Sequence, residues 1–408
     1  MSIARLLSFT EFLSGLWGVV LAVLVLLVMV VVHEFGHYIS GKILKFRINE
    51  FSVGFGPALL KKRSKKTGEL FSLRAIPLGG YCAFEGEDWE EETSQPELKT
   101  EEPFEELKVE PPQETATPAV EAVEYPEPKG AKFNDQAPWK RIIVLLSGAV
   151  MNYLLALVLL LVMTAIYGIP MCMAMPSDFK NDGTQTVPHA AWEETHLSAR
   201  DIFQEIDGVR IAMHTDCIEV LKGRKAGDTL QAIVLRRVDG EWKEKQVTIV
   251  LQTDANFADM ADIDGLHAAL GFKVYTTTLK GNFGQTVVGA LRYSGEMATA
   301  VLKTLGQLLT GQLGVDAVGG PVSTITETAK AASTSAFSLL YIASFIGVNL
   351  AVFNLLPVPA LDGSKVLFCL IEWIRKKPIN RKVEAILHFI GVIVIFGLAI
   401  LIDFLKLF

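Results

Sequence analysis

The chain has 408 residues, of which 50% are hydrophobic, and its mean hydropathy is positive, which is unusual for a soluble protein. Its net charge of −7 is unevenly distributed, because sixteen acidic residues and two lysines lie between Glu85 and Glu127. That segment carries −14 and the rest of the chain carries +7. No basic stripe with interleaved aromatic residues is present, so we expect no nucleic-acid partner.

Four segments are apolar for long enough to cross a bilayer, which takes about 20 residues. They are 12–41, 142–175, 331–361 and 385–402. The first is too long for the core of a signal peptide and no small-residue cleavage site follows it, so we expect it to be retained. The sequence therefore predicts an integral multi-pass membrane protein with an all-α core of four transmembrane helices.

The stretch after the first apolar segment predicts a membrane-associated β-hairpin or small sheet. Apolar residues alternate with polar ones on both sides of Thr67-Gly68, the dipeptide that would form the turn. The acidic segment that follows has few large apolar residues to offset the entropy of ordering, so we expect it to be disordered. A charged lid or a docking tail is the alternative for this insert.

The region between the second and third apolar segments is polar and predicts an inserted α+β domain. Strand-like runs at 230–237 and 245–251 flank a turn at Asp239-Gly240. Residues 281–313 are apolar with regular polar interruptions, which predicts an amphipathic helix on the membrane surface. The expected order of parts is transmembrane helix 1 (1–41), β region (42–84), acidic insert (85–130), transmembrane helix 2 (131–175), inserted domain (176–275), amphipathic surface region (276–330), transmembrane helix 3 (331–370) and transmembrane helix 4 (371–408).

Basic residues predict the orientation in the membrane. The loop between the first two apolar segments and the loop between the last two are rich in Lys and Arg, which places both in the cytoplasm. The inserted domain is then extracytoplasmic. His37 lies shortly before Lys42, so at about 1.5 Å per residue it is roughly 7 Å inside the cytoplasmic boundary. Asp362, at the end of the third apolar segment, is expected at a similar depth on the same side.

The first apolar segment ends in His33-Glu34-Phe35-Gly36-His37, an H-E-x-x-H pattern typical of zinc hydrolases. Residues four apart share one face of a helix, so the two histidines can bind one metal ion. Glu34 is offset from them and can accept a proton from a water at the open coordination position, as a general base. Ionisable groups in a membrane span are costly, which favours a functional role for this one.

A catalytic zinc ion needs a third protein ligand. Asp362 is the best candidate, because it is an acid at matching depth in an apolar segment interrupted by prolines. His388, in the fourth apolar segment, is the competing ligand, and its other interpretation is a packing residue. The alternative function is a membrane zinc or ion carrier without hydrolytic activity. A catalytically idle scaffold is disfavoured by Glu34, which metal binding alone does not require.

At these motifs the chain resembles the site-2 proteases, a family of intramembrane zinc metalloproteases. Within the family it is similar to the bacterial regulator-of-sigma-E protease type, which has one inserted PDZ domain. The matches are His33–His37 with H-E-x-G-H, Gly148 and Asn152 with G-x-x-x-N of the second span, and Asn354, Pro357, Pro359, Leu361, Asp362 and Gly363 with N-x-x-P-x-P-x-L-D-G.

The resemblance implies that Asp362 is the third zinc ligand and that the β region presents the substrate as an extended strand. It makes Asn354, Asn152, Gly79 and Gly80 candidates for contact with the substrate or the oxyanion. The implied substrates are single-span membrane proteins, such as pre-trimmed anti-sigma factors or remnant signal peptides. They would be cleaved within the lipid bilayer of the bacterial cell (plasma or inner) membrane, in regulated intramembrane proteolysis.

Two features depart from the family pattern. Ala149 follows Gly148 where the family often has proline. In the inserted domain Asp207-Gly208 fits the expected turn, but 197–201 replaces the usual Gly-Leu-x-x-Gly-Asp and no carboxylate-binding loop is visible. For this PDZ-like domain a size-excluding filter over the active site is at least as well supported as peptide capture.

The four cysteines do not form a C-x-x-C pair, so no structural zinc module is indicated. Cys172 and Cys217 are expected in the same compartment and are candidates for a disulfide. The alternative is that all four cysteines are buried as small apolar residues.

Overall fold

The structure is a computed structural model that describes residues 3–87, 125–175, 197–257, 262–311, 314 and 319–405. Most of the predicted acidic insert, and parts of the predicted inserted domain, lie outside the described residues. The chain divides into two compact units. Unit 1 comprises Met1–Ala22, Tyr153–Val352 and Ala399–Phe408, and unit 2 comprises Val23–Asn152 and Phe353–Leu398.

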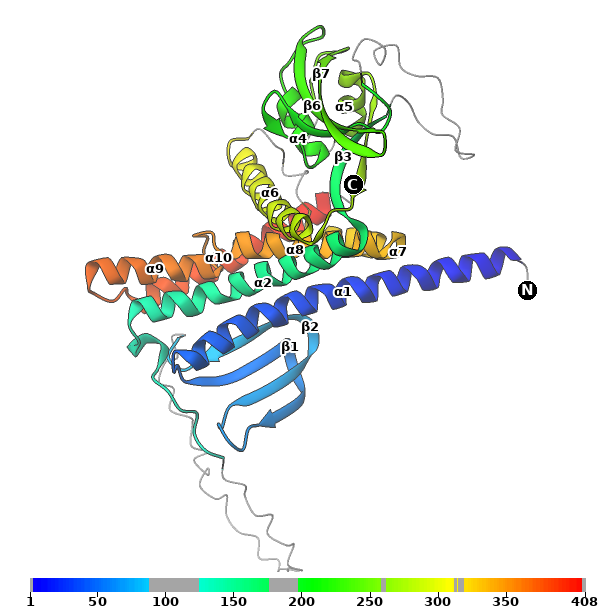
Figure 1. Cartoon of the computed structure of the whole chain (residues 1–408). Coiled ribbons are helices and arrows are strands. Elements are labelled where there is room, and N and C mark those ends of the chain that lie inside the picture. The colour runs from blue at the N-terminus through cyan, green and yellow to red at the C-terminus, as the bar shows by residue number, and fades with distance from the viewer. Residues whose placement is uncertain are drawn as a thin grey trace, which may run out of the picture. The chain divides into compact units, whose positions relative to one another are not determined.

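Four helices among the described residues are long and apolar enough to cross a membrane, which confirms the prediction of four such helices. They are α1 (Ile3–Ile43), α2 (Pro138–Tyr167), α8 (Ala336–Asn354) and α10 (Arg381–Leu405) (Figure 1). Only 11% to 33% of their most apolar windows is buried within the protein. Helices that expose so much apolar side chain are stable only where hydrocarbon surrounds them.

The predicted third apolar segment, 331–361, begins within the end of α7 (Pro321–Thr334), contains α8, and ends directly before α9 (Asp362–Arg375). The break after α8 follows from Pro357 and Pro359, which lack the N–H group that a continuing helix needs. Beyond them the chain turns tightly, since a Cβ added at Gly363 would lie 2.2 Å from the carbonyl oxygen of Leu356. The turn ends at Asp362, which therefore stands in the first turn of α9.

Unit 2 contains an antiparallel sheet of β1 (Ile48–Arg63) and β2 (Leu70–Phe84), as the alternating pattern around Thr67-Gly68 predicts. Both strands bend, so that Val53 of β1 pairs with Gly80 and also with Leu73 of β2. The segment after the bend in β2 therefore has β1 on one side and no strand on the other among the described residues. The sheet lies beside the C-terminal half of α1 (Figure 1).

Main-chain hydrogen bonds tie the sheet to the segment that leads into α2. The N–H of Phe133, in the short 3-10 helix η1 (Phe133–Asp135), donates to the carbonyl of Glu85 at 2.7 Å. The N–H of Arg47 donates to Ala131 O at 2.9 Å, and the N–H of Ala131 donates to Lys45 O at 3.1 Å. The two chain segments that flank the undescribed part of the acidic insert are therefore held side by side.

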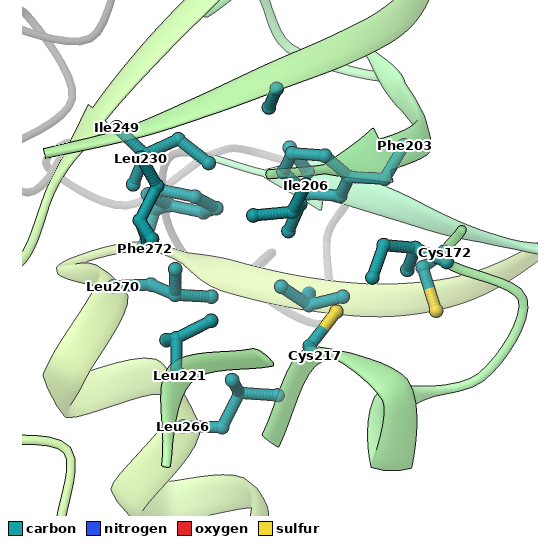
Figure 2. Close-up of a cluster of buried hydrophobic side chains, with 14 of the residues drawn as sticks. Cys172, Phe203, Ile206, Cys217, Leu221, Leu230, Ile249, Leu266, Leu270 and Phe272 are labelled. Atoms are coloured by element: carbon teal, nitrogen blue, oxygen red, sulfur yellow. The ribbon is translucent and has the colours of Figure 1, made fainter. Parts of the chain in front are cut away.

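Unit 1 contains a second antiparallel sheet, in the order β7-β6-β4-β3-β8, with β5 paired to β4. Its strands are β3 (Ile169–Met175), β4 (Ile202–Ile206), β5 (Val209–Arg210), β6 (Thr229–Val238), β7 (Glu241–Val250) and β8 (Lys273–Leu279). The helices α4 (His214–Leu221) and α5 (Ile263–Leu270) share a buried apolar core with it, shown in Figure 2. The assignment of this inserted domain as PDZ-like remains a prediction.

The described cysteines are all buried and all free. Cys172 on β3 and Cys217 on α4 belong to the core of the inserted domain, where they pack as small apolar residues (Figure 2). The structure therefore matches the second of the two interpretations that the sequence allowed, and no disulfide joins this pair.

The predicted amphipathic helix is present as α6 (Phe283–Leu309). Its buried face packs against α2 and α8 through Ala290, Tyr293 and Met297. Tyr153 of α2 adds a hydrogen bond to Ser294 of α6, with 2.8 Å between the two hydroxyl oxygens. Within unit 1, α6 is thus fixed to the membrane helices along one side, and another side faces the inserted domain, where Glu296 pairs with Arg210.

A buried ion pair joins α2 to α9 in unit 2. The Arg141 guanidinium donates to the Glu372 carboxylate, and the two residues are 3% and 5% exposed. Glu372 also accepts from the main-chain N–H of Ile379 at 2.9 Å and pairs with Arg381 at 3.0 Å. A charge so deeply buried is tolerated only with its partner in place. The pair therefore fixes how α9 is placed along α2.

Glu372→Met leaves the Arg141 guanidinium buried without a carboxylate. We expect the protein to lose about 3–5 kcal/mol of stability, the usual cost of breaking a buried pair. Adding Arg141→Met should recover most of this loss, because the double variant buries no unpaired charge. Thermal unfolding in detergent measures both. The control Lys330→Met removes one partner of a fully exposed pair and should change stability by less than about 1 kcal/mol.

Candidate metal centre

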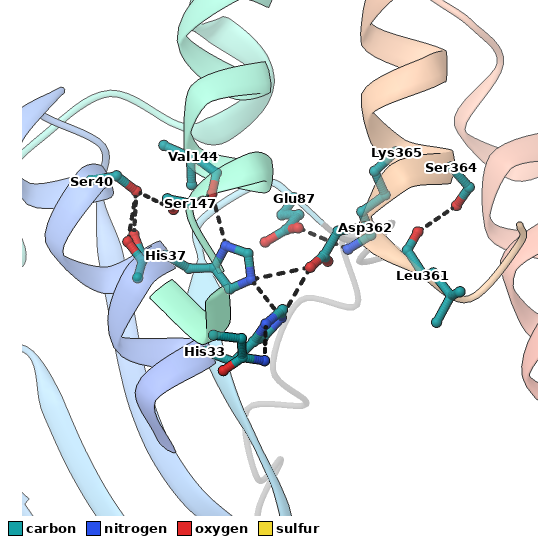
Figure 3. Close-up of polar contacts among 12 residues, drawn as sticks. His33, His37, Ser40, Glu87, Val144, Ser147, Leu361, Asp362, Ser364 and Lys365 are labelled. Carbon is teal, nitrogen blue, oxygen red and sulfur yellow. Dashed lines mark hydrogen bonds and ion pairs between the residues drawn. The ribbon is translucent and has the colours of Figure 1, made fainter. Parts of the chain in front are cut away.

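Three potential metal ligands from two distant parts of the sequence converge in unit 2 (Figure 3). His33 Nε2 lies 3.1 Å from His37 Nε2 and 3.0 Å from Asp362 Oδ2, and His37 Nε2 lies 3.4 Å from the same carboxylate oxygen. The two histidines project from α1 at helical spacing, and Asp362 projects from the first turn of α9.

These residues fit a zinc ion. Around a tetrahedral zinc with ligand bonds of about 2.0–2.1 Å, neighbouring ligand atoms lie about 3.3–3.4 Å apart. The three observed separations fall close to that value. Asp362 Oδ2 is buried and accepts no hydrogen bond from the described residues. Two imidazole nitrogens and a carboxylate also form a donor set that zinc prefers in catalytic sites with an open fourth position.

His37 is oriented by the main chain of α2. Its Nδ1 lies 2.8 Å from the carbonyl oxygen of Val144, to which it can only donate a hydrogen. The Nδ1–H tautomer leaves the lone pair of Nε2 free to point at the centre of the cluster. A ligating histidine is commonly fixed in this way by a carbonyl behind it.

Asn152 of α2 performs the same role for His33. Its amide Nδ2 lies 3.3 Å from His33 Nδ1, and its Oδ1 is buried with no partner among the described residues. A half turn of the amide exchanges these two atoms. Oδ1 then accepts from His33 Nδ1–H and leaves Nε2 free as a ligand. The orphaned oxygen is thus explained by a histidine that binds metal through Nε2.

Two glycines allow α1 and α2 to approach closely enough for these contacts. A Cβ added at Gly148 would lie 2.4 Å from His37 Nε2 and 2.7 Å from His33 Cε1. On the facing helix, a Cβ added at Gly36 would lie 2.4 Å from the carbonyl oxygen of Ser147. Small residues at such positions are the usual means of close helix packing in membranes. Here they also make space for the imidazole rings.

Glu34 faces the sheet rather than the facing helix. A Cβ added at Gly80 of β2 would lie 3.3 Å from Glu34 Cγ. The bare main chain of this strand therefore lies beside the Glu34 side chain. No hydrogen bond or ion pair holds the Glu34 carboxylate within the described part of the chain, so it remains available for proton transfer.

The other residues singled out in the sequence lie outside the cluster. Asn354 ends α8, and its side chain makes no hydrogen bond to the described residues. Gly79 has φ +120° and lies against Phe55, where a Cβ would come within 1.9 Å of the ring. His388 lies on α10 and is not among the described residues that form the metal group.

Two groups that position the metal ligands or the elements around them were not predicted from the sequence. The Val144 carbonyl orients His37, and no side-chain pattern marks a main-chain acceptor. Lys365, one turn after Asp362, pairs with Glu87 at 2.8 Å and so ties α9 to the end of β2 (Figure 3). The only sequence signal for it was a lone basic residue at helical spacing from the predicted ligand.

The family profile of Peptidase family M50 matches residues 21–398, which include every residue of this cluster. The chain belongs to peptidase family M50. It is a zinc metalloprotease of the site-2 type. Its four long apolar helices and its bacterial relatives indicate a bacterial integral membrane protein. The predicted resemblance, enzyme class and cofactor are therefore confirmed.

Relatives of this M50 protease match along nearly its whole length. "Zinc metalloprotease RasP" of Bacillus licheniformis is 26% identical over 92% of this chain and 94% of its own. "Regulator of sigma-W protease RasP" of Bacillus subtilis is 27% identical over 89% and 92%. A putative zinc metalloprotease of Mesorhizobium japonicum is 31% identical over 91% and 93%.

Gly148→Ala places a methyl group against both histidine rings of this M50 protease. We expect the rings to shift and zinc affinity to fall roughly 10- to 100-fold, as when a residue that orients a ligand is lost. Metal content after dialysis against a zinc buffer measures this. The matched control is Gly397→Ala in α10, where a Cβ meets nothing within 4 Å. Equal zinc retention by both variants would contradict the role of Gly148.

Proposed function

We propose that this zinc metalloprotease hydrolyses peptide bonds in or near the transmembrane segments of single-span membrane proteins, with His33, His37 and Asp362 as its zinc ligands and Glu34 as its general base. The observation that carries the proposal is the convergence of the three ligand atoms beside a free carboxylate, with both histidines on α1, a helix long and apolar enough to cross a membrane. A metal site at the end of an apolar helix gives access to bonds that a soluble protease does not reach.

When bound, zinc supplies a Lewis acid that activates water and polarises the scissile carbonyl. Glu34 accepts the proton that the attacking water loses, and it returns this proton to the nitrogen of the leaving amine. His33 and His37 hold their Nε2 lone pairs toward the site, because Asn152 and the Val144 carbonyl occupy the opposite ring nitrogens. Asn354 is the candidate donor to the substrate or the oxyanion.

The substrate binds as an extended strand along the free side of the bent end of β2. Residues 80–84 pair with β1 on one side only, so their main chain can accept a further strand. Gly79 and Gly80 begin this segment, and Gly80 lies against Glu34. Strand addition exposes a peptide bond that a transmembrane helix would hide. A bond carried past Gly80 in this way passes directly beside the general base.

The substrate class follows from the family and from one relative. The Bacillus subtilis relative is named a regulator of sigma-W protease, and we extend this role to the present chain. Its substrates are then anti-sigma factors already trimmed outside the membrane, or remnant signal peptides, in regulated intramembrane proteolysis. The active site faces the cytoplasm, and the PDZ-like inserted domain lies outside, where it screens substrates by size.

Glu34→Gln keeps the shape of the side chain but removes its basicity. We expect cleavage of a co-expressed, tagged single-span protein to fall by roughly 10²- to 10⁴-fold, the usual contribution of a general base. Zinc content should remain stoichiometric, because Glu34 is not a ligand. The control is Glu241→Gln, which removes an exposed carboxylate from β7. Equal cleavage by wild type and Glu34→Gln would exclude the proposed role.

Asp362→Ala removes the one proposed ligand that does not belong to α1. We expect the purified variant to lose its bound zinc, because two imidazoles alone do not hold a catalytic ion. Elemental analysis of the purified protein measures this. His388→Ala, the competing candidate, should retain zinc. The assignment fails if Asp362→Ala keeps stoichiometric metal while His388→Ala loses it.

A further inference from the structure

A groove of about 450 Å³ lies within unit 1, between the sheet of the inserted domain and the first half of α6. One wall consists of residues from β3, β4, β5, β6, β7 and β8. The other wall is α6 (Figure 1). The groove is distant in sequence from the metal ligands, and nothing in the proposed proteolysis uses it.

The groove lies immediately beyond the C-terminal end of α2, a helix long and apolar enough to cross a membrane. The helix α2 has 30 residues and so spans about 45 Å at 1.5 Å per residue, which matches a bilayer with both headgroup layers. Trp139 and Lys140 mark the interface at its first turn. At its other end, Gly168 leads directly into Ile169 of β3, which lines the groove. A Cβ added at Gly289 of α6 would lie 2.5 Å from Ile169, so α6 crosses at the same level.

The groove carries an excess of positive charge. Lys280, Arg210 and Arg292 line it, against a single acid, Glu296. Arg210 pairs with Glu296 at 3.6 Å, but Lys280 and Arg292 have no ion pair among the described residues. With Glu296 already paired to Arg210, the exposed cations Lys280 and Arg292 leave a net positive charge that a further anion could neutralise.

The pKa values of two of these groups are shifted, mainly by burial. Burial, and after it the charge of Arg292, lower the pKa of Arg210 below its ordinary value. Burial likewise raises the pKa of Glu296, although Arg210 and Arg292 oppose this shift. An additional bound anion would raise the pKa of Arg210 back toward its ordinary value, and it would leave Glu296 still more readily protonated.

An exposed apolar stripe of α6 runs out of the groove. Val288, Leu291 and Leu302 are 53%, 49% and 51% exposed and fall on one stripe at about 100° per residue. Val288 lines the groove itself, and Arg292 follows it by one helical turn. A ligand with its anionic end at Arg292 would therefore find apolar surface leading away from it along the helix.

We infer that this groove binds an anionic phospholipid, with the phosphate between Arg210, Arg292 and Lys280 and the acyl chains along the stripe of Val288, Leu291 and Leu302. The position of the site at the end of α2 and the continuous apolar stripe favour a lipid over a peptide carboxylate or free phosphate. Basic side chains beside a membrane surface attract anionic headgroups. The bound lipid contacts both walls and so bridges the inserted domain to α6.

The test is native mass spectrometry of the full-length protein in detergent, titrated with phosphatidylglycerol or phosphatidylcholine. We expect one phosphatidylglycerol to bind in preference to phosphatidylcholine. Lys280→Gln with Arg292→Gln should weaken this binding roughly thirtyfold, since each basic group beside an anionic lipid contributes a factor of roughly five. The control pair, Lys222→Gln with Lys225→Gln, removes the same charge from exposed positions outside the groove and should bind as wild type.

Three results would overturn the inference. The first is equal binding of phosphatidylglycerol by the groove variant and the control pair. The second is displacement of the lipid by equimolar inorganic phosphate, which would indicate a site for the free anion. The third is displacement by an apolar peptide with a free C-terminal carboxylate but not by its amide, which would indicate a peptide site.

A second measurement covers the case in which the groove variant does not fold. Trp242 lines the groove and is 39% exposed. In the otherwise wild-type protein, brominated phosphatidylglycerol should quench its fluorescence more than brominated phosphatidylcholine does. The Trp242 signal is the difference between wild type and Trp242→Phe. Equal quenching of this difference signal by the two lipids would contradict the inference.

Discussion

The structure of unit 2 depends on gathering three acceptor atoms within 4.8 Å of one another at the end of an apolar helix. Two imidazole nitrogens and a carboxylate oxygen repel one another unless a cation lies between them. In a membrane no bulk water is present to screen this repulsion. The surrounding groups therefore all act to orient lone pairs inward: the Val144 carbonyl behind His37, and Asn152 behind His33.

The close approach of the helices serves this constraint. Gly36 and Gly148 have no side chain, which allows α1 to lie against α2. A Cβ atom at Gly148 would occupy the space of the histidine rings. The third ligand, Asp362, comes from a separate helix, α9. The buried pair of Arg141 and Glu372 sets where α9 lies along α2, and so where Asp362 meets the histidines. Close helix packing and a buried ion pair thus bring the histidines of α1 and Asp362 of α9 together.

Much of the site could be predicted from the sequence, because its chemistry resides in side chains with fixed spacing. His33 and His37 share a helix face, and the prolines before Asp362 place an acid where an apolar segment ends. The four membrane helices follow from hydropathy, and the hairpin follows from alternation around Thr67-Gly68.

The rest depends on contacts that no local pattern encodes. Arg141 and Glu372 are 231 residues apart, and the Val144 carbonyl has no side-chain signature. The predicted third span, 331–361, contains α8, but the tight turn that leads from it into α9 and positions Asp362 is a property of the folded chain. The strand order β7-β6-β4-β3-β8 and the groove beside α6 arise from long-range pairing, which the sequence patterns of the separate strands do not specify.

The hydrogen bond from Phe133 to Glu85, with the main-chain pairing of Arg47 and Ala131, has a consequence for the acidic insert. It closes the fold around the metal centre before the acidic sequence begins and after it ends. The entropic cost of a closed loop rises by only about 0.6 kcal/mol for each doubling of its length. Beyond Glu87, which pairs with Lys365, the intervening sequence can therefore change in length at little entropic cost while the geometry of the zinc ligands stays constant.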